Sequence, residues 1–172
     1  QDLEGQFANA QRGGQIELAE KIRVKLRATV AKLYSYFDTI ISAIDKQFEN
    51  ISNMFATIPM TNLQKEQGEK EIKAYKARAE VNVRQSEEYY GRSNYIALQN
   101  TISELEESQK KLKAGSEEAL KLQGIIAIKN DELITQKKKL EDNHTALELA
   151  KRLAEIPTLL DDIHTTSKQA LE

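Results

Sequence analysis

The amino-acid sequence predicts an all-α protein, built as an elongated antiparallel long-helix bundle or coiled coil. The main observation is an aliphatic side chain at every seventh position, a spacing that keeps one face of a helix turned toward a partner. The composition agrees, because two prolines, seven glycines and 30% charged residues favour long helices over a turn-rich β protein. The aliphatic row consists of Leu105, Leu112, Ala119, Ile126, Leu133, Leu140, Leu147 and Ala154.

The chain is expected to begin with an arm and continue into a long helix. Residues 1–15 are polar and interrupted by glycines, so we expect a flexible N-terminal arm. The bundle body is expected over residues 16–156. Its first helix, predicted over 16–58, carries apolar residues in alternating steps of four and three. This heptad row consists of Val30, Tyr34, Phe37, Ile41, Ile44, Phe48, Ile51, Phe55 and Ile58.

A second apolar stripe runs beside the heptad row of this first helix. It consists of Leu26, Leu33 and Ile40, and it widens the apolar face beyond what one partner helix covers. The following segment, 62–95, is poor in apolar residues and cannot bury this face alone. We therefore treat Leu26, Leu33 and Ile40 as candidate interaction residues for a second copy or a partner chain.

The first break in the body is predicted at 59–61. Pro59 ends the first helix, and Thr61 with Gln64 forms the capping-box pattern that begins another. Such a short connection favours an antiparallel return. Both methionines of the chain lie at this tip, where flexible apolar side chains suit an adaptable contact surface. The candidate contact residues at the tip are Met54, Phe55, Ile58 and Met60.

Two further breaks are candidates, at 91–93 and at 113–116. Gly91 coincides with a shift of the apolar stripe by about one residue, which favours a bend over a straight rod. Gly115 and Ser116 have the chemistry of a helix end followed by a new cap. However, the aliphatic row continues across them, and a lone glycine costs a helix only about 1 kcal/mol. A hairpin turn and one continuous helix therefore both stay open.

The last segment, 157–172, is predicted as a short amphipathic helix after the break at Pro157. In the helix before it, polar residues stand four positions after each member of the aliphatic row. We interpret them as the complementary heptad positions and expect them to face solvent, although polar residues there can also fix register. They are Gln109, Ser116, Gln123, Asn130, Lys137, His144 and Lys151.

Composition and motifs disfavour several classes of function. A net charge of −2 with interleaved acids and bases lacks the basic footprint of a nucleic-acid binder, so we expect no such partner. No phosphate-binding glycine loop or catalytic nucleophile motif occurs, and we expect no catalytic residues, no cofactor and no small-molecule substrate. Glu141 with His144, and Asp161 with His164, have the spacing of di-iron ligands. Such pairs arise easily among 27 acids, and we expect no metal.

A long-helix bundle without a reaction motif is expected to be non-enzymatic. Its predicted role is that of a structural or assembly protein, acting through helix–helix association with itself or a partner chain. The alternative is a membrane-acting helical protein, either a subunit of an α-helical pore-forming toxin or a membrane-bending helical dimer. In that case residues 54–60 would touch a membrane surface. The sequence leaves the cellular compartment open.

Overall fold

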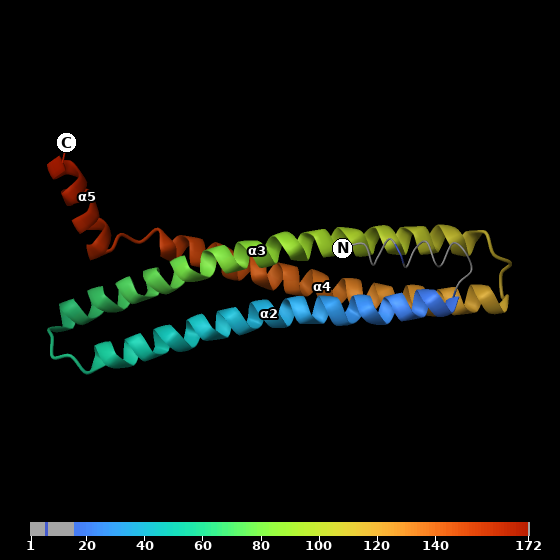
Figure 1. The fold of residues 1–172 in the computed structure, drawn as a ribbon, viewed down its shortest axis with the longest axis horizontal. Helices are drawn as coiled ribbons and strands as arrows, with labels where there is room; N and C mark the ends of the chain where they lie inside the picture. The colour runs from blue at the N-terminus through green and yellow to red at the C-terminus, as the bar shows by residue number, and fades with distance from the viewer. Residues whose placement is uncertain (1–5, 7–15, 172) are drawn as a thin grey trace. The chain divides into compact units, whose positions relative to one another are not determined.

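The structure is a computed structural model that describes Gln6 and residues 16–171, without the side chains of residues 16–20, Arg23 and His164. Residues 16–171 form four helices and no strand (Figure 1). The three longest, of 41, 49 and 38 residues, pack against one another and confirm the all-α bundle. The arm predicted over 1–15 lies, apart from Gln6, outside the described residues. The helices are α2 (Ile16–Ala56), α3 (Asn62–Lys110), α4 (Glu117–Ala154) and α5 (Leu159–Leu171).

The chain packs as two compact units, and each unit takes a part of α2, α3 and α4. Unit 1 consists of Gln1–Ser35 and Glu87–Asp142, and unit 2 consists of Tyr36–Ser86 and Asn143–Glu172. Within each unit, α3 runs in the opposite direction to α2 and α4 (Figure 1). The antiparallel arrangement predicted from the short connections is therefore present in both units.

The core of unit 1 gathers aliphatic side chains from α2, α3 and α4. It is formed by Ile22, Leu105, Leu122, Ile125 and Ile126, with Leu112 packed against them. Further along the same unit, Asn94 of α3 donates a hydrogen bond to Gln136 of α4 at 2.9 Å, and Gly91 lies against Leu140. Residue numbers rise on α4 as they fall on α3, as an antiparallel pair requires.

Unit 2 is held by small as well as large buried side chains. The most buried apolar residues are Phe37, Ala74, Ala77, Leu147 and Ala150. Because an alanine presents only a methyl group, the helix backbones can approach closely at these positions. Lys76 of α3 reaches Asp45 of α2 at 2.9 Å and links these two helices within the unit.

The two connections between the long helices have the chemistry predicted for them. At 57–61 the Thr61 backbone N–H donates to Gln64, and the Gln64 backbone N–H donates to the Thr61 hydroxyl, which is the reciprocal capping box. At 111–116, Gly115 has φ +79°, a conformation that favours glycine. Ser116 then caps α4 by accepting from the Ala119 N–H at 3.2 Å. The chain turns here, and the continuous-helix alternative is wrong.

The candidate break at 91–93 is wrong, because α3 runs unbroken from Asn62 to Lys110. Gly91 has a different role in the structure. It is buried, and a Cβ placed on it would lie 3.2 Å from the Leu140 Cδ1 and 3.6 Å from the Tyr34 hydroxyl. The glycine therefore allows close packing in unit 1.

The aliphatic row is turned inward as predicted, but its complementary row is shifted by one residue. All eight row members are buried or half-buried. In a heptad, a second inward row can follow the first after either three or four residues. In α4 it follows after three. It consists of Leu122, Lys129, Gln136, Asn143 and Ala150. The polar residues predicted as the complementary heptad positions therefore do not form the second inward row. Gln123, Lys137 and His144 do face solvent, as expected.

Candidate functional site

The stripe predicted to bind a partner is less open than its sequence pattern suggests. Leu26 is buried in unit 1, and Leu33 and Ile40 are half-buried. Leu26 also lines a groove between α2 and α4. The three residues therefore pack mainly within their own units, and a partner could reach only the edges of Leu33 and Ile40.

The hairpin tip in unit 2 presents part of the predicted apolar set to solvent. Met54 is 71% exposed and Ile58 is 53% exposed, whereas Phe55 and Met60 are half-buried. The Phe55 ring occupies the space that a side chain at position 68 would need, so Gly68 lets α2 and α3 approach at the tip. Of the four candidates, Met54 and Ile58 are the accessible ones.

Other exposed apolar residues were not among the candidate interaction residues. Leu63, at the beginning of α3, is 77% exposed and extends the tip. On α5 the large apolar residues, which form the apolar side of the amphipathic helix predicted over 157–172, are more than half exposed. They are Leu159, Leu160, Ile163 and Leu171.

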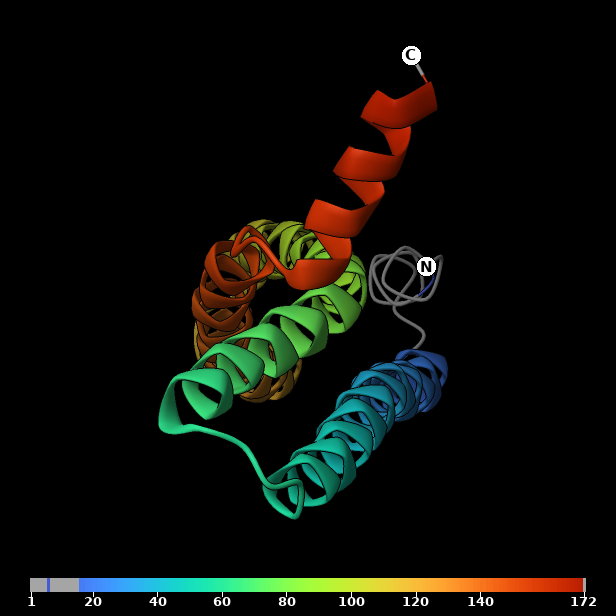
Figure 2. The same ribbon diagram turned by 90° about the vertical axis from the view of Figure 1, so that its left-hand side faces the viewer.

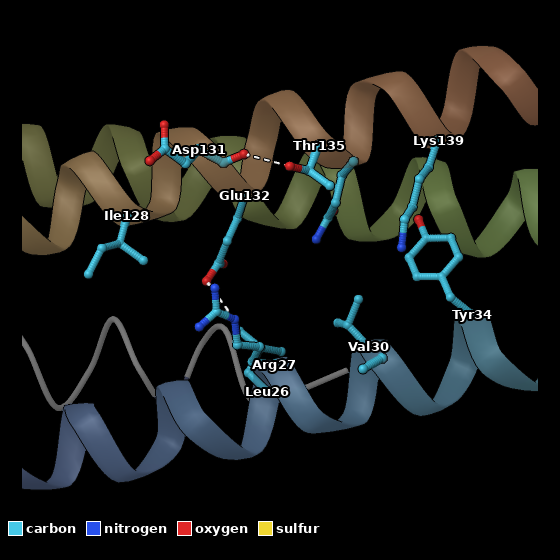
Figure 3. A pocket seen from close by; sticks show the side chains of 11 residues that line it. Leu26, Arg27, Val30, Tyr34, Ile128, Asp131, Glu132, Thr135 and Lys139 are labelled. Atoms are coloured by element: carbon cyan, nitrogen blue, oxygen red, sulfur yellow. Dashed lines mark hydrogen bonds and ion pairs between the residues drawn. The ribbon is translucent and has the colours of Figure 1, made fainter.

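Unit 1 contains a groove of about 350 Å³ between α2 and α4 (Figure 3). Leu26 and Val30 of α2 and Ile128 of α4 give it apolar walls, and the polar side chains come mainly from α4. Sequence reasoning missed this groove, because it depends on the separation of two helices that run side by side in the same direction. No local motif encodes such a spacing.

Three charged side chains are linked at the groove. Glu132 lies 3.8 Å from the Arg27 Nε and 3.7 Å from the Lys129 Nζ. Lys129 is 0% exposed, which is unusual for a lysine. One buried oxygen of Glu132 accepts no hydrogen bond within the described residues. The carboxylate thus lies between the buried ammonium of Lys129 and the exposed guanidinium of Arg27 in unit 1.

Tyr34 closes the other end of the groove. Its side chain is buried, and the Lys139 ammonium lies over its ring at 4.3 Å from the centroid, a cation–π contact (Figure 3). Burial raises the pKa of the Tyr34 hydroxyl above its usual value, and the Glu87 carboxylate raises it further. The hydroxyl therefore stays protonated in neutral solution and can donate a hydrogen bond.

The carboxylate–histidine pairs do not gather into a metal site within the described part of the chain. No group of three or more His, Cys, Asp or Glu side chains that could hold a metal ion is found there. Glu141 and His144 are exposed on α4. The His164 side chain lies outside the described residues, and the Asp161 carboxylate binds an arginine.

The beginning of α5 is fixed to α3 by Arg78. Its guanidinium donates to both carboxylate oxygens of Asp161, at 2.6 and 3.2 Å, and to the carbonyls of Ala154 and Ile156. Asp161 also accepts from the backbone N–H and hydroxyl of Thr158, completing a cap on α5. The hydrogen bond from Arg78 lowers the pKa of Asp161 to about 2, and those from Thr158 act in the same direction.

We expect this junction to open in acid. Because the pKa of Asp161 is lowered on folding, its stabilising effect is complete above about pH 4 and is lost as the pH falls through about 2. A carbon-detected NMR titration should place the Asp161 midpoint near 2. The variant Arg78→Ala should raise it toward the usual value of about 3.9. An unchanged midpoint in Arg78→Ala, with folding retained, would show that Arg78 does not hold Asp161.

Comparisons of the chain with protein-family models, with curated proteins and with solved structures found no match. Among the described helices, none combines the length and apolarity needed to cross a membrane.

Proposed function

We propose that this chain is a non-enzymatic structural or assembly protein that acts through helix–helix association with itself or with a partner chain. The observation that carries the proposal is the set of large apolar side chains exposed on the long helices and on α5. Contiguous apolar surface on a soluble protein commonly marks an interaction site. In unit 2 the exposed apolar residues include Met54, Ile58 and Leu63 at the tip and the apolar side of α5.

The side chains that line the groove in unit 1 also favour a structural role. Three of its charged side chains already have partners within the unit, since Arg27 pairs with Glu132 and Lys139 covers the ring of Tyr34. These contacts stabilise the packing of α2 against α4. Their present arrangement thus has a structural role within unit 1.

Association can be tested by thermal unfolding at several protein concentrations. A native state that associates is stabilised by mass action, so the Tm should rise as the concentration increases from about 1 to 100 μM. The control is a second scan of each sample, which checks that unfolding is reversible. A Tm that is independent of concentration, with reversible unfolding, would contradict self-association.

A second candidate function is contact with a membrane surface through the hairpin tip. The observation that favours it is the exposure of Met54, Ile58 and Leu63 at one end of unit 2. An apolar loop tip can insert into the boundary between headgroups and acyl chains.

Liposome binding and dye leakage test this second candidate. If the tip binds lipid, the double variant Met54→Asp, Ile58→Asp should lose binding, because charges are costly at that depth. Both positions are exposed, so the variant should keep its helicity by circular dichroism. Replacement of the exposed Gln47 and Glu49 by alanine is the matched control. Wild type that neither binds nor leaks would exclude membrane contact through the tip under those conditions.

A further inference from the structure

Helix α5 extends away from the rest of unit 2 (Figure 2). Among its described side chains, which leave out His164, Asp161 is the only one that is not exposed. Packing of apolar side chains therefore contributes little to the direction in which α5 leaves the unit. The hydrogen bonds that join α5 to the rest of the unit lie at its first turn and come from α3.

Arg78 of α3 binds both the end of α4 and the beginning of α5. Its guanidinium donates to the carbonyl oxygens of Ala154 at 3.0 Å and Ile156 at 3.1 Å. The last carbonyls of a helix have no partner within it, and a cation is favourable beside them because the helix dipole is negative at that end. The same guanidinium donates to both carboxylate oxygens of Asp161 in the first turn of α5. One side chain of α3 thus links the two helices.

Glu71 of α3 binds the N-terminal end of α5 with the opposite charge. Its carboxylate accepts a hydrogen bond from the backbone N–H of Leu159, the first residue of α5. The first N–H groups of a helix have no partner within it, and they favour a negative charge. Glu71 and Arg78 are seven residues apart, so they lie on the same side of α3. This side of α3 therefore offers a cation to the end of α4 and an anion to the beginning of α5.

The break between α4 and α5 has a different cause from the direction of α5. Pro157 has no N–H and disfavours a helical conformation at the residue before it, so α4 does not continue into α5. The Thr158 N–H donates to the Asp161 carboxylate, and the Asp161 N–H donates to the Thr158 hydroxyl, as in a capping box. These contacts are local and would accompany α5 in any direction. The bonds to Arg78 and Glu71 instead join α5 to the bundle.

We propose that Glu71 and Arg78 form a latch that sets the direction of α5, and that α5 turns about residues 155–158 when this latch opens. The side chains of Arg78 and Asp161 are 33% and 46% exposed, so water and ions reach the ion pair at the centre of the latch. Ion pairs that are open to solvent contribute little to stability. The latch can therefore open while the bundle stays folded. This inference concerns a movement within one chain and does not depend on self-association.

A distance measurement between two spin labels tests the latch, because the chain contains no cysteine that would compete for the labels. The labels are attached to Lys73→Cys on α3 and Ser167→Cys on α5, both at exposed positions. Double electron–electron resonance is recorded on the full-length chain, diluted with excess unlabelled chain so that only distances within one chain contribute. With the latch intact, the distance distribution should be narrow. Arg78→Ala should make it at least about twofold wider, because a segment without tertiary contacts samples many orientations.

The matched control is Arg84→Ala. Arg84 lies on the same helix, but its contacts are with Glu80 and with Asn143 of α4. Its removal should therefore leave the distance distribution narrow. Glu71→Ala should widen the distribution as Arg78→Ala does, because it removes the other charge of the latch.

Each result supports or overturns the latch. A wide distribution with Glu71 and Arg78 intact would show that they do not hold α5, and a distribution as narrow in Arg78→Ala as in Arg84→Ala would show that Arg78 does not set its direction. A narrow distribution in Glu71→Ala would overturn the part assigned to Glu71. If Arg78→Ala loses its helicity by circular dichroism, Arg78→Lys decides instead. Lysine keeps the charge but lacks the fork of donors, so the distribution should still widen, and a narrow one would overturn the latch.

Discussion

Replacing Leu105 by alanine is expected to lower the free energy of unfolding by about 2–5 kcal/mol. Leu105 is 1% exposed and lies in the core cluster of unit 1, where it packs with residues from α2 and α4. The truncation removes apolar contacts and leaves a cavity that the neighbouring helices α2 and α4 cannot readily fill. Denaturant unfolding followed by circular dichroism measures the loss.

The matched control for this substitution is Leu120→Ala. Leu120 is 59% exposed on α4, so its truncation should change the free energy of unfolding by no more than about 0.5 kcal/mol. Equal losses for the two variants would mean that Leu105 is not in the core of the folded chain. That result would contradict the packing described for unit 1.

Replacing Lys129 by alanine is expected to cost about 3–5 kcal/mol, because one partner of a buried ion pair is removed. Lys129 is fully buried, and its ammonium lies 3.7 Å from Glu132. The alanine variant loses both the charge and the volume of the long aliphatic stem. Lys129→Met keeps most of that volume, so we expect it to be destabilised less than the alanine variant.

Two further variants complete this test. Adding Glu132→Gln to Lys129→Met removes the remaining buried charge and should recover part of the lost stability. Lys138→Ala, at an exposed position on the same helix, should be nearly neutral. If Lys129→Ala were as harmless as Lys138→Ala, the side chain of Lys129 would have to lie in solvent.

Periodicity and capping chemistry predicted much of this fold. The reciprocal bonds of Thr61 and Gln64, the cap at Ser116 and the inward aliphatic row of α4 all follow from local sequence. These features depend on residues within one or two helical turns of each other. Local physical chemistry is therefore sufficient to place them.

Glycines show where local sequence is insufficient. Gly91 and Gly115 both stand in helical surroundings, yet one permits close packing inside α3 and the other ends a turn at φ +79°. The aliphatic row crosses the turn because Leu112, in the connection, packs against the core of unit 1. A seven-residue spacing can thus continue across a turn, and only the packed structure distinguishes the two cases.

The sequence could predict the exposure of only some candidate interaction residues, because exposure depends on how the helices pack. The width of the apolar stripe pointed to Leu26, but this residue is buried within unit 1. Exposure depends on how far neighbouring helices lie from one another, and side-chain spacing along one helix does not determine that distance. For the same reason the groove between α2 and α4 and the buried Lys129 had no signature in the sequence.

The central claim, that this chain works by helix–helix association, is tested most directly by its mass in solution. Sedimentation equilibrium should be measured on the wild type from about 1 to several hundred micromolar, with helicity confirmed at each concentration. The account predicts a reversible rise of the mass above the 19.5 kDa of one chain, reaching that of a dimer or a larger assembly. A single species of 19.5 kDa over the whole range would contradict self-association.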